Sequence, residues 1–180
     1  MKKLLVSGIL LFGMVLLNNS NAFAQNDLKL GGGLVFGSGV FDFDELDNDL
    51  GIKVDGVYSF NEEFRGNADL VFFFPKSEGN VDVSLFSINL NGNYIFLSEE
   101  ELTAYGLAGI NIAIIKVDTE QSFGGQTFGG SNSESELGLN LGAGVEYGLD
   151  FADLFGELKF AGLGGDADQL VIGAGLRFAI

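Results

Sequence analysis

The sequence predicts an all-β fold, an antiparallel barrel of eight up-and-down strands. Apolar residues recur at every second position along most of the chain, a spacing that places them on one face of a strand. Phe, which favours strands, occurs 18 times, whereas Pro, which interrupts them, occurs once. The segments between these stretches alternate between long and short, as in a meander whose strands run up and down.

The first residues have the pattern of a secretory signal peptide. A basic start, Met1 to Lys3, precedes an apolar run at 4–17, and small residues stand at Ala22 and Ala24. A membrane-spanning helix needs about 20 apolar residues, so this run is too short to be one. We therefore expect residues 1–24 to be removed and residues 25–180 to form the barrel domain.

The alternation defines the eight strands, and each approaches the roughly ten residues that a tilted strand needs to cross a bilayer. They are expected at 28–36, 52–60, 64–74, 86–96, 102–117, 137–147, 154–160 and 170–180. One face of each strand is apolar and aromatic. The stretch at 102–117 is apolar at both parities, so its faces stay unassigned.

The opposite face is rich in Gly and polar residues, and its cations and acids are balanced. Four of each occupy strand positions there: Lys53, Asp55, Arg65, Asp69, Glu146, Glu157, Lys159 and Arg177. Equal numbers of opposite charges neutralise one another in a narrow lumen, whereas an exposed surface has no need of such balance. The sequence therefore predicts an interior ion-pair network of these eight residues.

The connections indicate where the apolar face points. Long segments at 37–49, 75–81, 118–135 and 162–168 alternate with short ones at 61–63, 98–101 and 148–152. This layout is typical of transmembrane barrels of the bacterial outer membrane, which close because hydrocarbon offers no partner to a free strand edge. The alternative is a soluble secreted or periplasmic barrel with inverted faces, which would bind a small hydrophobic ligand in an apolar lumen. The signal peptide and the charge balance favour the membrane.

Three segments carry a family resemblance: Ala22-Phe23-Ala24 before the first strand, 155–160 (FGELKF) and 171–178 (VIGAGLRF). With them the chain resembles the small eight-stranded outer-membrane β-barrel proteins of the OmpA/OmpX type over essentially its whole mature length. That family usually ends its last strand with an aromatic residue, whereas here Phe178 lies two positions before the terminal Ile180. The resemblance implies location in the outer membrane, contact with outer-membrane lipid and lipopolysaccharide, and a monomer.

Composition excludes several chemistries. The chain has no Cys and no His, hence no thiolate, no imidazole base and no usual zinc site. A net charge of −16 argues against nucleic acid as a partner. A carboxylate pair such as Glu146 with Glu157 is a hydrolytic alternative, but pairing with the cations is favoured. We expect no enzyme, no cofactor and, with eight strands, no wide pore.

Two of the long connections stand out. Asp42, Asp44, Asp47 and Asp49 lie in one acidic segment, and carboxylate oxygens suit Ca²⁺ or Mg²⁺. The spacing is not that of an EF-hand, and a solvated acidic loop is the simpler interpretation. Residues 121–135, rich in Gly, Ser and Asn, are expected to be a structureless loop. The expected role is structural or interactive: envelope integrity, adhesion, or contact with ions and partners through acidic loops.

Overall fold

The computed structural model describes residues 28–38, 49–78, 81–123, 126–165 and 167–180. Within them the chain forms nine strands: β1 (Leu28–Gly37), β2 (Asp49–Ser59), β3 (Phe64–Phe73), β4 (Lys76–Glu78), β5 (Val81–Ser98), β6 (Leu102–Phe123), β7 (Gln126–Gly148), β8 (Asp153–Leu163) and β9 (Gln169–Ala179). No helix among these residues is long and apolar enough to cross a membrane.

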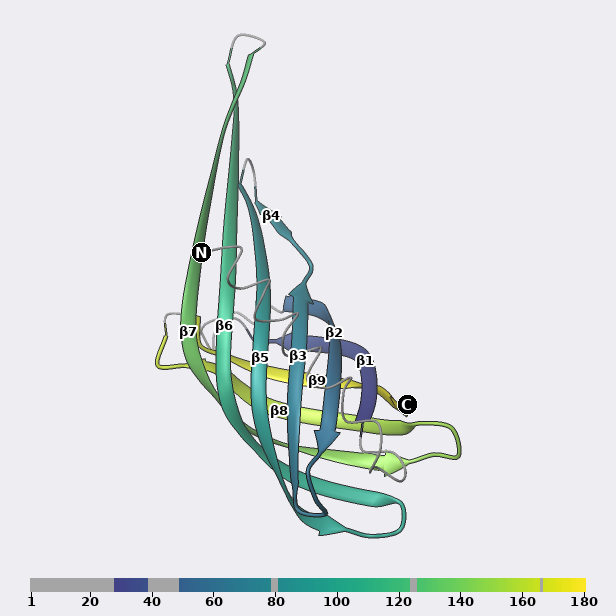
Figure 1. Ribbon diagram of the computed structural model, residues 1–180. Helices are drawn as coiled ribbons and strands as arrows, with labels where there is room; N and C mark the ends of the chain where they lie inside the picture. Colours follow the sequence, from purple (N-terminus) through teal and green to yellow (C-terminus); the bar gives the residue numbers. More distant parts are fainter. Residues whose placement is uncertain (1–27, 39–48, 79–80, 124–125, 166) are drawn as a thin grey trace, which may run out of the picture.

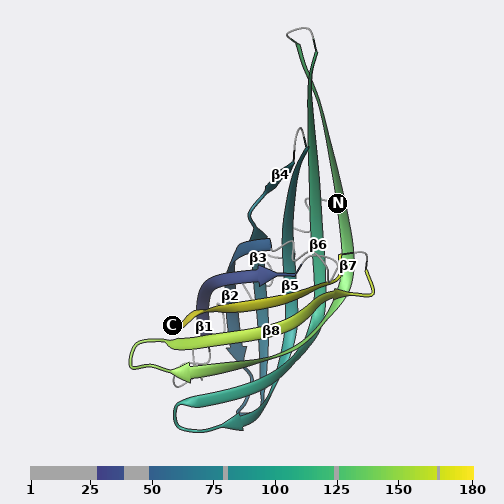
Figure 2. The ribbon, with the colours of Figure 1, turned by 180° about the vertical axis from the view of Figure 1, so that it is seen from behind.

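The strands close into a barrel (Figures 1 and 2). Every pairing between neighbours is antiparallel, β1 pairs with β9, and β3 pairs with β5. Only the short β4 stands outside the ring, because it pairs with β5 beyond the end of β3. The predicted eight-stranded antiparallel barrel is confirmed, and β4 is a small addition in a segment expected to be a connection.

The apolar face of the barrel points outward. Ile52, Leu70 and Leu141 are 45%, 44% and 57% exposed, whereas Arg65 and Lys159 are both 4% exposed. A barrel of this kind is stable only where lipid covers its outer surface, since so large an apolar area costs free energy in water. The alternative of a soluble barrel with inverted faces is therefore wrong.

Strand β6 has defined faces, although its sequence is apolar at both parities. Tyr105, Leu107, Asn111 and Ala113 are buried, while Ile110, between them, is 41% exposed. From Tyr105 to Ala113 the odd-numbered residues of this strand therefore point into the lumen. A shift of register in the β5–β6 pairing lies near the strand's start, between Ile95 and Leu97 of β5.

Strands β6 and β7 continue well beyond the rest of the barrel. Their pairing runs without interruption to Phe123 and Gln126, and Figure 1 shows the paired ends projecting past the other strands. We call residues 115–123 and 126–136 the β6–β7 ribbon. The expectation of a structureless loop at 121–135 is wrong. The β-branched residues of β6 carry the strand outward as far as Thr119, and no Pro interrupts the ladder. The short connections and the C-terminus lie at the opposite end.

The barrel closes where β1 meets β9, and glycines permit the close approach there. Gly33 and Gly175 are directly paired across this seam. A Cβ on Gly175 would lie 2.1 Å from the carbonyl oxygen of Gly32, and one on Gly33 would lie 2.2 Å from that of Ala174. These contacts are with backbone, so a side chain at either position forces the two strands apart.

Gly175→Ala is expected to lower the free energy of unfolding by about 1 to 3 kcal/mol, because overpacking displaces the seam. The measurement is urea unfolding in lipid vesicles, followed by far-ultraviolet circular dichroism. Gly92→Ala is the matched control, since the nearest atom to a Cβ on this glycine would be 3.9 Å away. Equal midpoints for the two variants would contradict the steric argument.

Candidate functional site

The lumen is organised around Arg177, which is completely buried. Its Nη2 donates hydrogen bonds to Asp55 Oδ2 at 2.5 Å and to Glu157 Oε1 at 2.9 Å. Its Nη1 donates to Glu146 and, at 3.0 Å, to Tyr105 Oη. One guanidinium on β9 thus binds carboxylates from β2, β7 and β8. Because β2 and β7 lie on opposite sides of the ring, the contacts cross the lumen rather than follow one pair of strands.

Two aromatic side chains lie against the two arginines of the lumen. The Arg177 Cζ lies 4.2 Å from the centroid of the Phe155 ring, and the Arg65 Cζ lies 4.5 Å from that of Tyr105. The Tyr105 hydroxyl also donates to Glu157 Oε1 at 2.7 Å. Both arrangements bring a guanidinium over an aromatic face, where the ring quadrupole attracts positive charge.

The remaining charges join the same network. Arg65 Nη1 donates to Glu146 Oε2 at 2.7 Å. Lys53 binds Glu157, and Lys159 Nζ lies 3.4 Å from Asp69 Oδ2. Lys53 Nζ is also 3.4 Å from Asp55 and 3.9 Å from Asp69, so it connects the carboxylates around Arg177 with the Lys159–Asp69 pair. The structure brings together all eight residues of the sequence hypothesis: Lys53, Asp55, Arg65, Asp69, Glu146, Glu157, Lys159 and Arg177. We call them the ionic cluster.

Pairing is what makes this burial tolerable. A lone ion moved out of water costs several kcal/mol, whereas opposite charges in contact recover much of that cost. The four cations and four carboxylates of the ionic cluster balance. Glu146 and Glu157, the hydrolytic alternative of the sequence, both bind Arg177. Their proton-accepting oxygens are therefore engaged with a cation, which favours a structural use of these acids.

Other polar residues of the lumen were not part of the sequence hypothesis. Lys29 reaches Asp153 at 2.7 Å and Glu146 at 3.4 Å, at the end of the barrel with the short connections. Tyr105 was missed because β6 has no parity signal. Its partner across the β6–β7 pairing is Gly144, on which a Cβ would lie 2.5 Å from the phenol. The sequence signal that could have identified Tyr105 is a glycine at the inward position of the neighbouring strand, which leaves room for a large aromatic side chain.

A ladder of asparagines continues the polar interior toward the ribbon. Asn91 Nδ2 donates to Asn67 Oδ1 at 3.1 Å, and Asn140 Nδ2 donates to both Asn89 Oδ1 at 2.9 Å and Asn91 Oδ1 at 2.8 Å. Asn111 Nδ2 donates to Asn89 Oδ1 at 2.8 Å. Amides carry both donors and acceptors, so such a ladder links polar side chains across the lumen without adding net charge, although Asn140 Oδ1 is buried without a partner among the described residues.

An apolar cluster covers the polar interior on the side of the long connections. Its members are Val35, Val71, Phe73, Ala161 and Val171, with Leu85 packed against them. All five are 2% or 3% exposed. The lumen of the described chain is thus filled by side chains in layers, as expected for a barrel of eight strands.

The acidic segment proposed for Ca²⁺ falls largely outside this description. Asp42, Asp44 and Asp47 lie outside the described residues. Asp49 begins β2 and pairs with Gly37, but its side chain is not described. Among the residues that are described, no three acids are grouped so that they could hold a metal ion. The cation site at this segment stays a prediction.

A closed barrel with an apolar exterior and a charged, filled lumen defines a transmembrane β-barrel protein. The profile of the family described as "Outer membrane protein beta-barrel domain" matches residues 7–178, and the chain belongs to this family. The family places the chain among proteins of the outer membrane. No curated protein matches the sequence.

Solved outer-membrane proteins share the fold. Ail, the attachment invasion locus protein of Yersinia pestis, is 20% identical with a TM-score of 0.59, covering 86% of this chain and 100% of that one. Neisserial surface protein A is 17% identical with a TM-score of 0.62, covering 86% and 97%. The N-terminal barrel of Pseudomonas aeruginosa OprF is 14% identical with a TM-score of 0.51, covering 86% and 100%. Identities this low establish the fold alone.

Arg177→Met is expected to lower the free energy of unfolding by about 3 to 5 kcal/mol, because it leaves three buried carboxylates without their shared cation. Urea unfolding in lipid vesicles measures the change. Lys116→Met serves as the control: Lys116 is 52% exposed and pairs with Asp118 on the ribbon, so its removal should cost about 1 kcal/mol or less. Similar losses in the two variants would contradict a central role for Arg177.

Proposed function

We propose that this protein is exported by its N-terminal segment and anchors the β6–β7 ribbon at the outer face of the outer membrane. There the ribbon binds an extended, basic protein segment. In this role the ionic cluster holds the barrel rigid, and the ribbon carries the interaction. The long connections of outer-membrane barrels face outward, which supports placing the ribbon outside the cell.

The export step rests on the sequence of residues 1–24. We expect the protein from the outer-membrane fraction to begin at Gln25, because signal peptidase cleaves after Ala-x-Ala patterns. Intact-mass spectrometry measures this directly. Replacing Ala22 and Ala24 with Leu should leave the precursor uncut, whereas replacing Asn18 and Asn19 should not. A wild-type mass that includes Met1 would contradict the proposal.

The free edge of β7 is the observation that carries the proposed interaction. Pairing of β7 with β8 begins only at Leu139, so within the described residues no strand pairs with this edge from Gln126 to Gly138. Residues 129–135 are all exposed. A free edge presents backbone donors and acceptors at regular spacing, which an extended peptide can meet by adding a strand.

The charge of the ribbon indicates the kind of partner. Glu134 and Glu136 lie on β7 near the base of the ribbon, and Asp118 lies on β6. Hydrogen bonds from Lys116 and Ser131 hold the pKa of the Asp118 carboxyl below its usual value, so it remains ionised under physiological conditions. An acidic strand edge attracts a segment with Lys or Arg and raises its rate of association.

This charge also argues against one ligand of a relative. A second structure of Ail contains the heparin analogue sucrose octasulfate; it is 20% identical to this chain with a TM-score of 0.56, covering 84% and 96%. A polysulfated ligand requires clustered cations. In the described part of the ribbon Lys116 is the only cation, and the other charged residues are acids. The proposed partner is therefore of the opposite charge.

The interaction can be tested with the full chain in lipid nanodiscs and a twelve-residue peptide of alternating Lys and Val. The double change Glu134→Lys with Glu136→Lys should weaken binding about tenfold, since two favourable ion pairs become repulsive. Isothermal calorimetry at low and high salt measures the affinity, and salt should weaken it.

The matched control for charge is the double change Glu99→Lys with Glu100→Lys, in the short connection between β5 and β6 at the other end of the barrel. It alters net charge equally but should leave the affinity unchanged. Equal loss in both double variants would show attraction by overall charge only. Binding of heparin instead of the Lys-Val peptide would contradict the proposal.

A further inference from the structure

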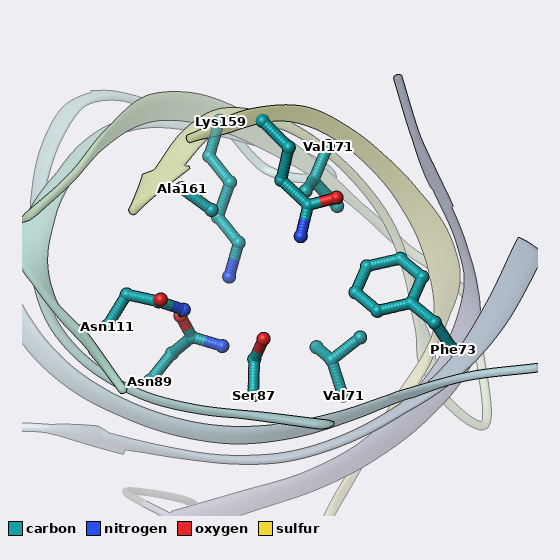
Figure 3. A pocket seen from close by; sticks show the side chains of 9 residues that line it. Val71, Phe73, Ser87, Asn89, Asn111, Lys159, Ala161 and Val171 are labelled. Atoms are coloured by element: carbon teal, nitrogen blue, oxygen red, sulfur yellow. The ribbon is translucent and has the colours of Figure 1, made fainter. Parts of the chain in front are cut away.

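A small cavity lies between the ionic cluster and the apolar cluster (Figure 3). Its volume is about 10 Å³, and Val71, Phe73, Ala161 and Val171 form its apolar wall. Its polar wall comes from β5, β6, β8 and β9. The polar side chains are Ser87, Asn89, Asn111, Lys159 and Gln169.

The hydrogen bonds around the cavity are unevenly distributed. Asn89 Nδ2 donates to Asp69 Oδ1 at 2.7 Å, and Asn111 donates to Asn89. In contrast, Ser87 Oγ and Gln169 Oε1 are buried and have no hydrogen-bond partner among the described residues. A buried oxygen left in this way destabilises the fold, so a small donor beside it is favoured.

Lys159 is the third element of the site. Its ammonium lies 3.4 Å from both oxygens of Asp69, a long contact for a buried cation. Figure 3 shows the amine of Lys159 and the hydroxyl of Ser87 directed into the same space. An ammonium has three donors, so it retains capacity for a further acceptor.

We propose that this cavity binds a single water molecule held by Ser87, Gln169 and Lys159. Water donates two hydrogen bonds and accepts others, so one molecule satisfies both oxygens and accepts from the ammonium. The volume is near the lower limit of roughly 10 to 15 Å³ that one water requires, and three polar partners are typical for a buried water. The site thereby solvates Lys159 where the ionic cluster meets the apolar cluster.

Charged ligands fit this cavity less well. A halide would accept a hydrogen bond from Lys159 but would lie against the side-chain amide oxygen of Gln169 and close to the carboxylate of Asp69. A metal cation would be held by the two oxygens but repelled by the ammonium of Lys159. Water is the small ligand that meets donor and acceptors together.

A crystal structure of the full chain at about 1.8 Å, grown with bromide in place of chloride, tests the proposal. We expect a density peak without anomalous signal, at about 2.7 to 3.2 Å from Ser87 Oγ and from Gln169 Oε1. An anomalous bromide peak in the cavity would overturn the assignment in favour of a halide. An empty cavity at that resolution would overturn it as well.

Variants give a second, independent measurement. In solution, a water-to-methyl nuclear Overhauser effect should be present at Ala161 in the wild type and lost in Gln169→Leu, which removes one of the oxygens. Ser135→Ala, on the exposed ribbon, should leave the signal unchanged. A signal of full strength in folded Gln169→Leu would overturn the role of Gln169. These results do not depend on what the ribbon binds.

Discussion

The contact between Arg177 and its carboxylates is the interaction on which the rest of this barrel depends. A guanidinium at the centre of a narrow tube surrounded by lipid has no bulk water to solvate it, so only opposite charges and hydrogen-bonding groups can hold it there. Asp55, Glu146 and Glu157 reach it from three different strands. Because those strands lie around the ring, the same contact that neutralises the cation also ties distant parts of the sheet together across the lumen.

The layers along the axis strengthen this arrangement. The apolar cluster covers the polar interior on one side, and a medium with little water increases the attraction between opposite charges. The asparagine ladder joins the ionic cluster to the cavity beside the apolar cluster, and it adds no net charge to the lumen. Outside the hydrocarbon the requirement is reversed: residues 129–135 of β7 are exposed on both faces of the strand, so polar residues and a free edge are tolerated there.

Much of the architecture could be predicted from sequence because one rule, the period of two, assigns faces wherever lipid lies on one side and charge on the other. That rule placed Lys53 and Arg177 on the same face. It failed where its condition failed, in β6, where Tyr105 points inward among apolar neighbours, and in the ribbon, where water meets both faces. It does not give partners either: Arg177 and Asp55 are 122 residues apart, and the closed geometry of the ring brings them together.

The distribution of charge separates the two tasks of the molecule. The sequence contains 25 acids and 9 bases, yet the ionic cluster is neutral, so the excess of acid lies outside it. Changes of charge at Glu134 or Asp118 therefore leave the paired interior untouched, because neither residue contacts it among the described ion pairs. Conversely, the buried pairs have little influence on an approaching partner, since a neutral cluster has a weak external field. A barrel of this kind can change what its surface binds without losing the charge balance that keeps it folded in the membrane.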